Sequence, residues 1–122
     1  MLDFGNNQTQ AAMSQQVVRS YKLRFQCFVG RGKPAVEYYL DAGAKLPTGP
    51  MPGEDCLDLD PATVQARPTG DHWTIINKGS EYAFTAPNQE LANKAIAIIQ
   101  KYGATKSCFV GRPNPGMRYL RQ

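Results

Sequence analysis

Two short segments of this chain carry the residues best suited to chemistry. Both contain Cys-Phe-Val-Gly-Arg, once over residues 27–31 and once over residues 108–112. A cysteine thiolate is a nucleophile when a base lies beside it, and an arginine can bind a carboxylate or phosphate through two hydrogen bonds. Arg31 and Arg112 each follow the glycine of a predicted turn, so we take them as candidates for ligand contact.

The three cysteines indicate a disulfide more than catalysis or metal binding. The chain has a single histidine, His72, and no closely spaced cysteine pair, which argues against a structural zinc site. Of the three possible pairings we favour Cys56–Cys108, because both belong to the more complete half of the chain. A disulfide requires an oxidising location, so we expect an extracellular or periplasmic protein. A hydrolase that uses a cysteine with His72 as its base is an alternative.

Acidic residues gather around Cys56, but their spacing does not match a calcium-binding loop. Two of them alternate with leucines, which is the pattern of a strand with one solvated face. We predict neither a metal site nor a cofactor here. The acidic residues concerned are Glu54, Asp55, Asp58 and Asp60.

Charge and hydropathy narrow the classes of partner. The net charge of the 122 residues is +4, but the lysines and arginines are scattered and form no cluster, so we predict no nucleic-acid partner. No segment approaches the roughly 20 apolar residues of a membrane span. The first ten residues lack the basic and apolar regions of a signal peptide.

The repeated motif belongs to a longer internal repeat with an offset of 81 residues. Identical or similar residues recur at this offset in a predicted helix, a strand, a Gly-Arg-x-x-Pro turn and a return strand. The matched pairs are Val17 and Ile98, Tyr21 and Tyr102, Cys27 and Cys108, Gly30 and Gly111, Pro34 and Pro115, and Tyr38 and Tyr119.

The elements that must position these residues follow from periodicity and capping. Asn7 and Asn88 are good helix N-caps, and Gly103 is a typical helix stop. Strands are expected over residues 23–29 and 104–110, with return strands over 36–40 and 117–119. Further strands are expected over residues 56–60 and 63–66, and a hairpin joins residues 73–76 to 82–84.

We predict an α+β fold in which two helices pack on one antiparallel sheet. It arises from an internal duplication: a helix-strand-turn-strand unit occurs twice, with an extra hairpin between the copies. The expected organisation is a single compact domain over residues 1–122, with a partial first unit (1–41), a Gly/Pro-rich loop (42–54) and a complete second unit (55–122).

Strand parity predicts which side chains face the core. In the first strand Leu23, Phe25, Cys27 and Val29 share the inward face. The opposite parity leaves other aromatic side chains free for a ligand or an interface. The aromatic candidates are Phe28, Tyr39 and Trp73.

The sequence contains no convergent set of acid, base and nucleophile, so we expect no enzyme. The favoured function is a secreted interaction module that binds a protein or a glycan. The alternative is a structural subunit that assembles with copies of itself into a fibre or ring. Its motivation is that the first unit lacks counterparts of the strands that precede the second helix, so that a strand or helix exchanged between chains would complete it.

Overall fold

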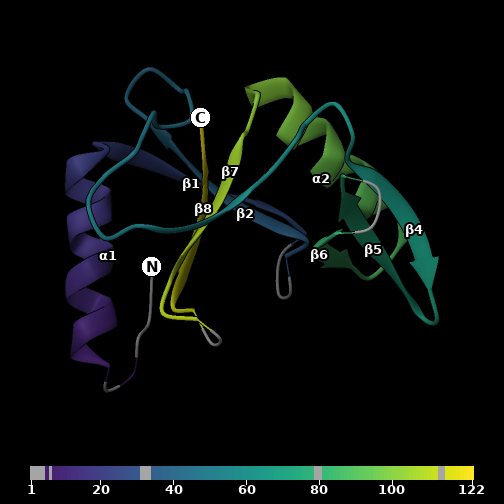
Figure 1. The fold of residues 1–122 in the computed structure, drawn as a ribbon, viewed down its shortest axis with the longest axis horizontal. Coiled ribbons are helices and arrows are strands. Elements are labelled where there is room, and N and C mark those ends of the chain that lie inside the picture. The colour runs from purple at the N-terminus through teal and green to yellow at the C-terminus, as the bar shows by residue number, and fades with distance from the viewer. Residues whose placement is uncertain (1–4, 6, 31–33, 79–80, 113–114) are drawn as a thin grey trace.

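The computed structural model describes residues 5, 7–30, 34–78, 81–112 and 115–122, and the side chains of residues 81–83 are not considered. The predicted α+β class is confirmed, with two helices and antiparallel strands (Figure 1). The helices are α1 (Gln8–Ser20) and α2 (Gln89–Tyr102). The strands are β1 (Leu23–Val29), β2 (Val36–Asp41), β3 (Asp55–Asp58), β4 (Gln65–Thr69), β5 (His72–Asn77), β6 (Glu81–Ala86), β7 (Lys106–Val110) and β8 (Met117–Arg121).

Both helices begin where the sequence predicts, and α2 also ends at its predicted stop. The side chain of Asn7 accepts a hydrogen bond from the backbone N–H of Gln10 at 3.0 Å, and that of Asn88 accepts one from Leu91 at 2.9 Å. These bonds satisfy N–H groups that have no partner inside the helix. At the end of α2, Gly103 adopts the left-handed conformation with φ 63°. A residue without a Cβ takes this conformation at little cost.

The expectation of a single sheet is wrong, because the strands described form three small antiparallel sheets. Their strand orders are β1-β2, β3-β7-β8 and β4-β5-β6. Strands β2 and β8 contact each other without pairing. Side chains from both strands enter two core clusters, so their contact is made by side-chain packing rather than by a hydrogen-bonded ladder.

Each helix packs against the hairpin of the other half of the chain, and α2 packs most extensively on the β4-β5-β6 sheet. Val17 of α1 lies in a buried cluster with Cys108 and Met117 of the β7-β8 hairpin. Ala95 and Ile99 of α2 lie in a second cluster with side chains of the β1-β2 hairpin. The β4-β5-β6 sheet packs against α2 as well (Figure 1). The elements recur in the same order 81 residues apart, while the duplication as their origin stays a prediction.

The predicted inward face of β1 is only partly correct. Leu23 and Val29 are buried, but the Phe25 side chain is 50% exposed. The pairing of β1 with β2 shifts between Leu23 and Phe25, and such a bulge turns the following side chain away from simple alternation. Cys27 is half-buried, whereas its counterpart Cys108 is fully buried.

Candidate functional site

The predicted disulfide between Cys56 and Cys108 is confirmed. The two residues face each other directly in the β3-β7 ladder, with their Cα atoms 4.0 Å apart. The third cysteine, Cys27, has a free thiol. The bridge therefore ties β3 to the middle strand of its sheet, and its sulfurs are not available as thiolate ligands for a metal.

Glu54 is a buried carboxylate that joins the long loop to both halves of the chain. It accepts hydrogen bonds from the hydroxyls of Tyr21 at 2.7 Å and Tyr119 at 2.5 Å, and from Nε of Arg121 at 2.9 Å. Burial alone would raise the pKa of Glu54, but the hydrogen bonds from Tyr119 and Tyr21 and the nearby Arg121 lower it below its ordinary value. Every partner is a residue of this chain, so this site is a structural clamp.

The other acidic residues near Cys56 also have partners within the chain. Asp55 forms a bidentate ion pair with Arg112, and the hydrogen bonds that it accepts from that guanidinium lower the pKa of Asp55. Asp58 pairs with Lys106. The carboxylate of Asp60 accepts a hydrogen bond from the backbone N–H two residues later. The fold disperses these four carboxylates rather than gathering them around one point.

The described residues predicted as ligand contacts lie on strands of two sheets and in the turn after β7. The guanidinium of Arg112 lies 4.8 Å from the centroid of the Phe109 ring and is already paired with Asp55. Arg31 lies outside the described residues. Phe28 is 36% exposed on β1, and Trp73 is half-buried on β5.

The expectation that Tyr39 is exposed is wrong, because its side chain is only 5% exposed on β2. Strand β2 packs between two core clusters, so this residue is buried on one side as Tyr38 and Leu40 are on the other. Its hydroxyl donates to Glu37 at 2.9 Å and accepts from Gln26 at 2.9 Å. Burial raises the pKa of Tyr39 well above its ordinary range, with the Glu37 carboxylate adding to this effect.

The catalytic alternative gains no geometric support from the described residues. His72 pairs with its exposed neighbour Asp71, with Nδ1 and the carboxylate oxygen 3.2 Å apart. Cys27 lies beside Tyr38 of β2, whose pKa is raised to about 12, first by burial and then by the thiol. The nucleophile and the base of the proposed hydrolase thus each have a different neighbour.

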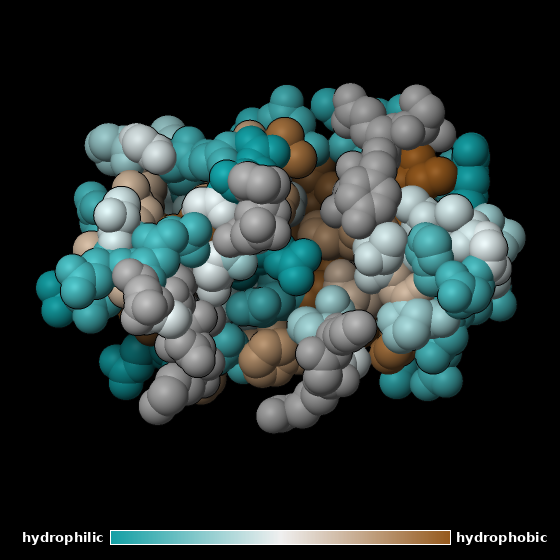
Figure 2. All heavy atoms as spheres, turned by 90° about the horizontal axis from the view of Figure 1, so that it is seen from below, coloured by the Kyte–Doolittle hydropathy of each residue, from teal (hydrophilic) through white to brown (hydrophobic). Residues whose placement is uncertain are grey.

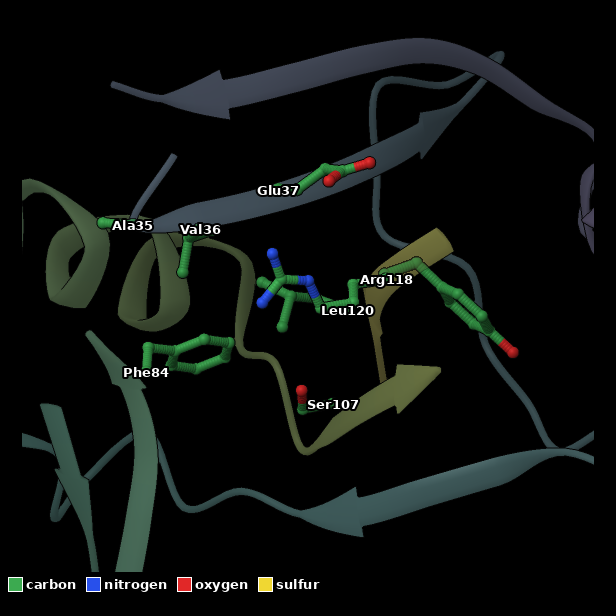
Figure 3. Close-up of a pocket in the computed structure, with 8 residues that line it drawn as sticks. Ala35, Val36, Glu37, Phe84, Ser107, Arg118 and Leu120 are labelled. Atoms are coloured by element: carbon green, nitrogen blue, oxygen red, sulfur yellow. The ribbon is translucent and has the colours of Figure 1, made fainter. Parts of the chain in front are cut away.

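A small hollow with a volume of about 10 Å³, room for about one water molecule, lies where β2, β6, β7 and β8 meet (Figure 3). We call it the Arg118 hollow. Its walls are mainly apolar, and its polar side chains belong to Glu37, Ser107 and Arg118. The lining residues are Ala35, Val36, Glu37, Phe84, Ser107, Arg118, Tyr119 and Leu120. Figure 2 shows a hydrophobic, hollowed area between hydrophilic groups on one face of the molecule.

Two polar groups in the Arg118 hollow have no partner among the residues that the structure describes. They are the guanidinium of Arg118, which is exposed, and the hydroxyl of Ser107, a residue only 7% exposed. In Figure 3 the guanidinium extends toward Val36 and Phe84, the hydroxyl points into the same space, and the Glu37 carboxylate turns aside. Unpaired donors beside apolar walls are typical of a small binding site.

At the corresponding positions of the first hairpin, the side chains form hydrogen bonds with one another. Positions 81 residues before Ser107, Arg118 and Leu120 are Gln26, Glu37 and Tyr39. These three form a hydrogen-bonded group, in which the Glu37 carboxylate accepts from Tyr39 at 2.9 Å and from Gln26 at 3.5 Å. The second hairpin replaces this closed group by a small hydroxyl, an arginine and a leucine.

Comparison with protein-family models, with curated proteins and with solved structures finds no match to this chain. The site therefore rests on its own geometry.

Parity and motif spacing did not identify Arg118 or Ser107, since each is a common residue on a strand. The repeat did contain a signal. Ser107 and Arg118 differ in size or charge from the residues 81 positions earlier, whereas the neighbouring cysteine and aromatic residues are the same in both halves. Neither helix of the described chain has the length and apolar character needed to cross a membrane.

Proposed function

We propose that this protein is a secreted, non-catalytic interaction module that binds a segment of a partner protein in the Arg118 hollow. The observation that carries the proposal is an arginine without a partner among the described residues, beside the apolar walls formed by Val36, Phe84 and Leu120. A guanidinium in this setting attracts an anionic acceptor.

A protein segment fits the hollow better than a glycan does. Sugars are commonly bound on exposed aromatic faces. The aromatic residues that line this hollow, Phe84 and Tyr119, are 8% and 1% exposed. Its volume of about 10 Å³ is also far below the roughly 300–1,000 Å³ typical of sites for drug-sized ligands, so a partner segment would contact the exposed Arg118 at its rim rather than fill it.

The secreted location is supported by the disulfide, since such bonds persist in oxidising compartments. We also infer that the two halves arose by duplication and that the second then diverged. This inference is supported by the recurrence of helix, strand and return strand at one offset, with a closed polar group in one half and an open hollow in the other.

Selection from a displayed library of random heptapeptides tests the proposal. We expect the immobilised protein to enrich a defined family of peptides, and the Arg118→Ala variant to lose most of that enrichment. Arg67→Ala is the matched control, because Arg67 is also an exposed arginine on a strand but lies away from the hollow on β4. Circular dichroism checks that both variants remain folded.

Equal enrichment by the wild type and the Arg118→Ala variant would refute the hollow as the binding site. Binding to a glycan array without peptide enrichment would replace the protein partner by a glycan. Light scattering over a range of concentrations tests the alternative of self-assembly, which predicts a mass that rises with concentration.

A further inference from the structure

We infer that the outer edge of β1 binds an extended, acidic segment of a partner protein, which adds a third strand antiparallel to β1. β1 pairs with β2 along one edge, and no strand of the described chain pairs with its other, outer edge. An open edge of this kind allows strand addition, in which main-chain hydrogen bonds hold the added segment. This surface is distinct from the Arg118 hollow, whose lining includes no residue of β1.

The second half of the chain shows what occupies the matching edge. The β1-β2 and β7-β8 hairpins pair in the same register, since in each a cysteine faces a tyrosine and the two pairs are 81 residues apart. On the outer edge of β7 lies β3, which runs antiparallel and places Cys56 opposite Cys108. The edge of β1 thus has the pairing geometry that accepts a strand in this fold, but none of the described strands occupies it.

Exposed apolar side chains mark the same strand. Of the three large apolar side chains that are exposed in the described chain, two belong to β1, where Phe25 is 50% and Phe28 is 36% exposed. In β7 the matching phenylalanine, Phe109, lies opposite β3 and is less exposed. Cys108, also opposite β3, is fully buried, whereas Cys27 is only half-buried. A strand beside β1 would cover apolar surface that now contacts water, which favours binding.

The charge of the partner segment follows from the basic side chains at the beginning of β1. Lys22 and Arg24 are exposed, and neither forms an ion pair with a residue that the structure describes. In the second half, two carboxylates of β3 pair with basic side chains of β7 and of the turn after it. Acidic side chains on the partner segment would form the corresponding pairs, which favour the correct partner. β1 itself carries no acidic residue, so a second copy of this strand cannot supply them.

NMR titration of the whole protein with matched peptides tests the inference. The acidic probe is acetyl-Thr-Asp-Ser-Leu-Asp-Thr-amide, which follows the pattern of β3. The second peptide has lysines in place of the aspartates, and the third has proline in place of the leucine. We expect the acidic peptide to shift the amide signals of β1. The lysine peptide should bind more weakly because of its charge, and the proline peptide because it lacks an N–H that the ladder uses.

Charge reversal in the protein provides the matched variants. Arg24→Glu should weaken binding of the acidic peptide about fivefold and strengthen binding of the lysine peptide, as expected for an exposed charge pair. Arg67→Glu reverses an exposed arginine on β4 and should bind the acidic peptide as the wild type does. Arg118→Ala should also retain this binding, because the hollow takes no part in it. Circular dichroism checks that each variant remains folded.

The outcomes separate this site from the other possibilities. Equal binding of the acidic and lysine peptides, shifts confined to other strands, or no shifts with any peptide would overturn the inference. Signals of β1 that move with protein concentration when no peptide is present would identify a second copy as the occupant and overturn it as well. Failure of the library selection, while the acidic peptide binds β1, would remove the hollow as a binding site and leave this inference standing.

Discussion

The ring of Tyr21, at the end of α1, packs against the ring of Tyr119 on β8, with centroids 6.0 Å apart. Its counterpart in the repeat, Tyr102 at the end of α2, packs against Tyr38 on β2 at 5.7 Å. The two pairs are reciprocal, since each tyrosine of a helix contacts the hairpin of the other half. The halves are thus interlocked rather than placed side by side, and neither hairpin has its main helix partner within its own unit.

Interlocking predicts that a cut in the connecting loop does not separate the halves. A protease site inserted between Gly43 and Ala44, in an exposed turn, should yield two fragments that still elute together with an unchanged circular dichroism spectrum. The reason is that α1 stays packed on β7 and β8. Size-exclusion chromatography of the cut protein provides the measurement. Separation of the fragments without denaturant would contradict the crossed packing.

Substitution of Gly111 should destabilise the contact between α1 and the second hairpin. Gly111 has φ 83°, and a Cβ added there would collide with the side chain of Gln10 on α1. We expect Gly111→Ala to lower the free energy of unfolding by about 2 kcal/mol, from backbone strain and the collision together. Urea unfolding measures this change.

The double variant Gln10→Ala/Gly111→Ala separates the two causes. The double variant should remove the collision but not the backbone strain. Its free energy of unfolding should therefore exceed that of Gly111→Ala without reaching that of Gln10→Ala. Full recovery would show that the positive φ costs nothing here. In the other half, Gly30 lies against Leu91, at the matched positions, and a Cβ there would meet the leucine at 3.1 Å.

Replacement of Glu54 by glutamine should destabilise the protein and alter its acid sensitivity. The variant removes the charge that compensates Arg121, which is 7% exposed, so we expect a loss of about 3 kcal/mol near neutral pH. Thermal unfolding measures this loss. Asp58→Asn, which breaks an exposed pair, should change stability little.

The pH dependence follows from the direction of the pKa shift. Because the folded protein lowers the pKa of Glu54, its stabilising effect is fully present above the ordinary pKa of 4.5 and is lost as the pH falls through the lower folded value. The melting temperature of the wild type should therefore drop between about pH 5 and pH 2. In Glu54→Gln this drop should be smaller, and an equally steep drop would argue against the clamp.

The disulfide should contribute strongly to stability. Cys56 and Cys108 are 52 residues apart in the chain, and the loop-closure estimate for that separation is about 4 kcal/mol. Cys108→Ser should thus unfold at a much lower urea concentration than Cys27→Ser, which removes only a free thiol. Reductant should lower the stability of the wild type toward that of Cys108→Ser. Peptide mapping that joined Cys27 to either of the others would contradict the observed pairing.

Local features of the sequence determined the elements and one covalent link of this protein. Asn7, Asn88 and Gly103 mark helix ends because capping and left-handed backbone depend on near neighbours. The Cys56–Cys108 pairing was also predictable, since both cysteines fall in the complete half of the chain.

The tertiary structure alone decided how those elements combine. Division into three sheets, exposure of Phe25, burial of Tyr39 and the exchange of helices between hairpins all depend on contacts between residues distant in the chain, and a periodic pattern carries no information about which partner a buried face will meet. The Arg118 hollow belongs to this second group. It lies where β2, β6, β7 and β8 meet, and is therefore a property of the assembled strands and not of any one of them.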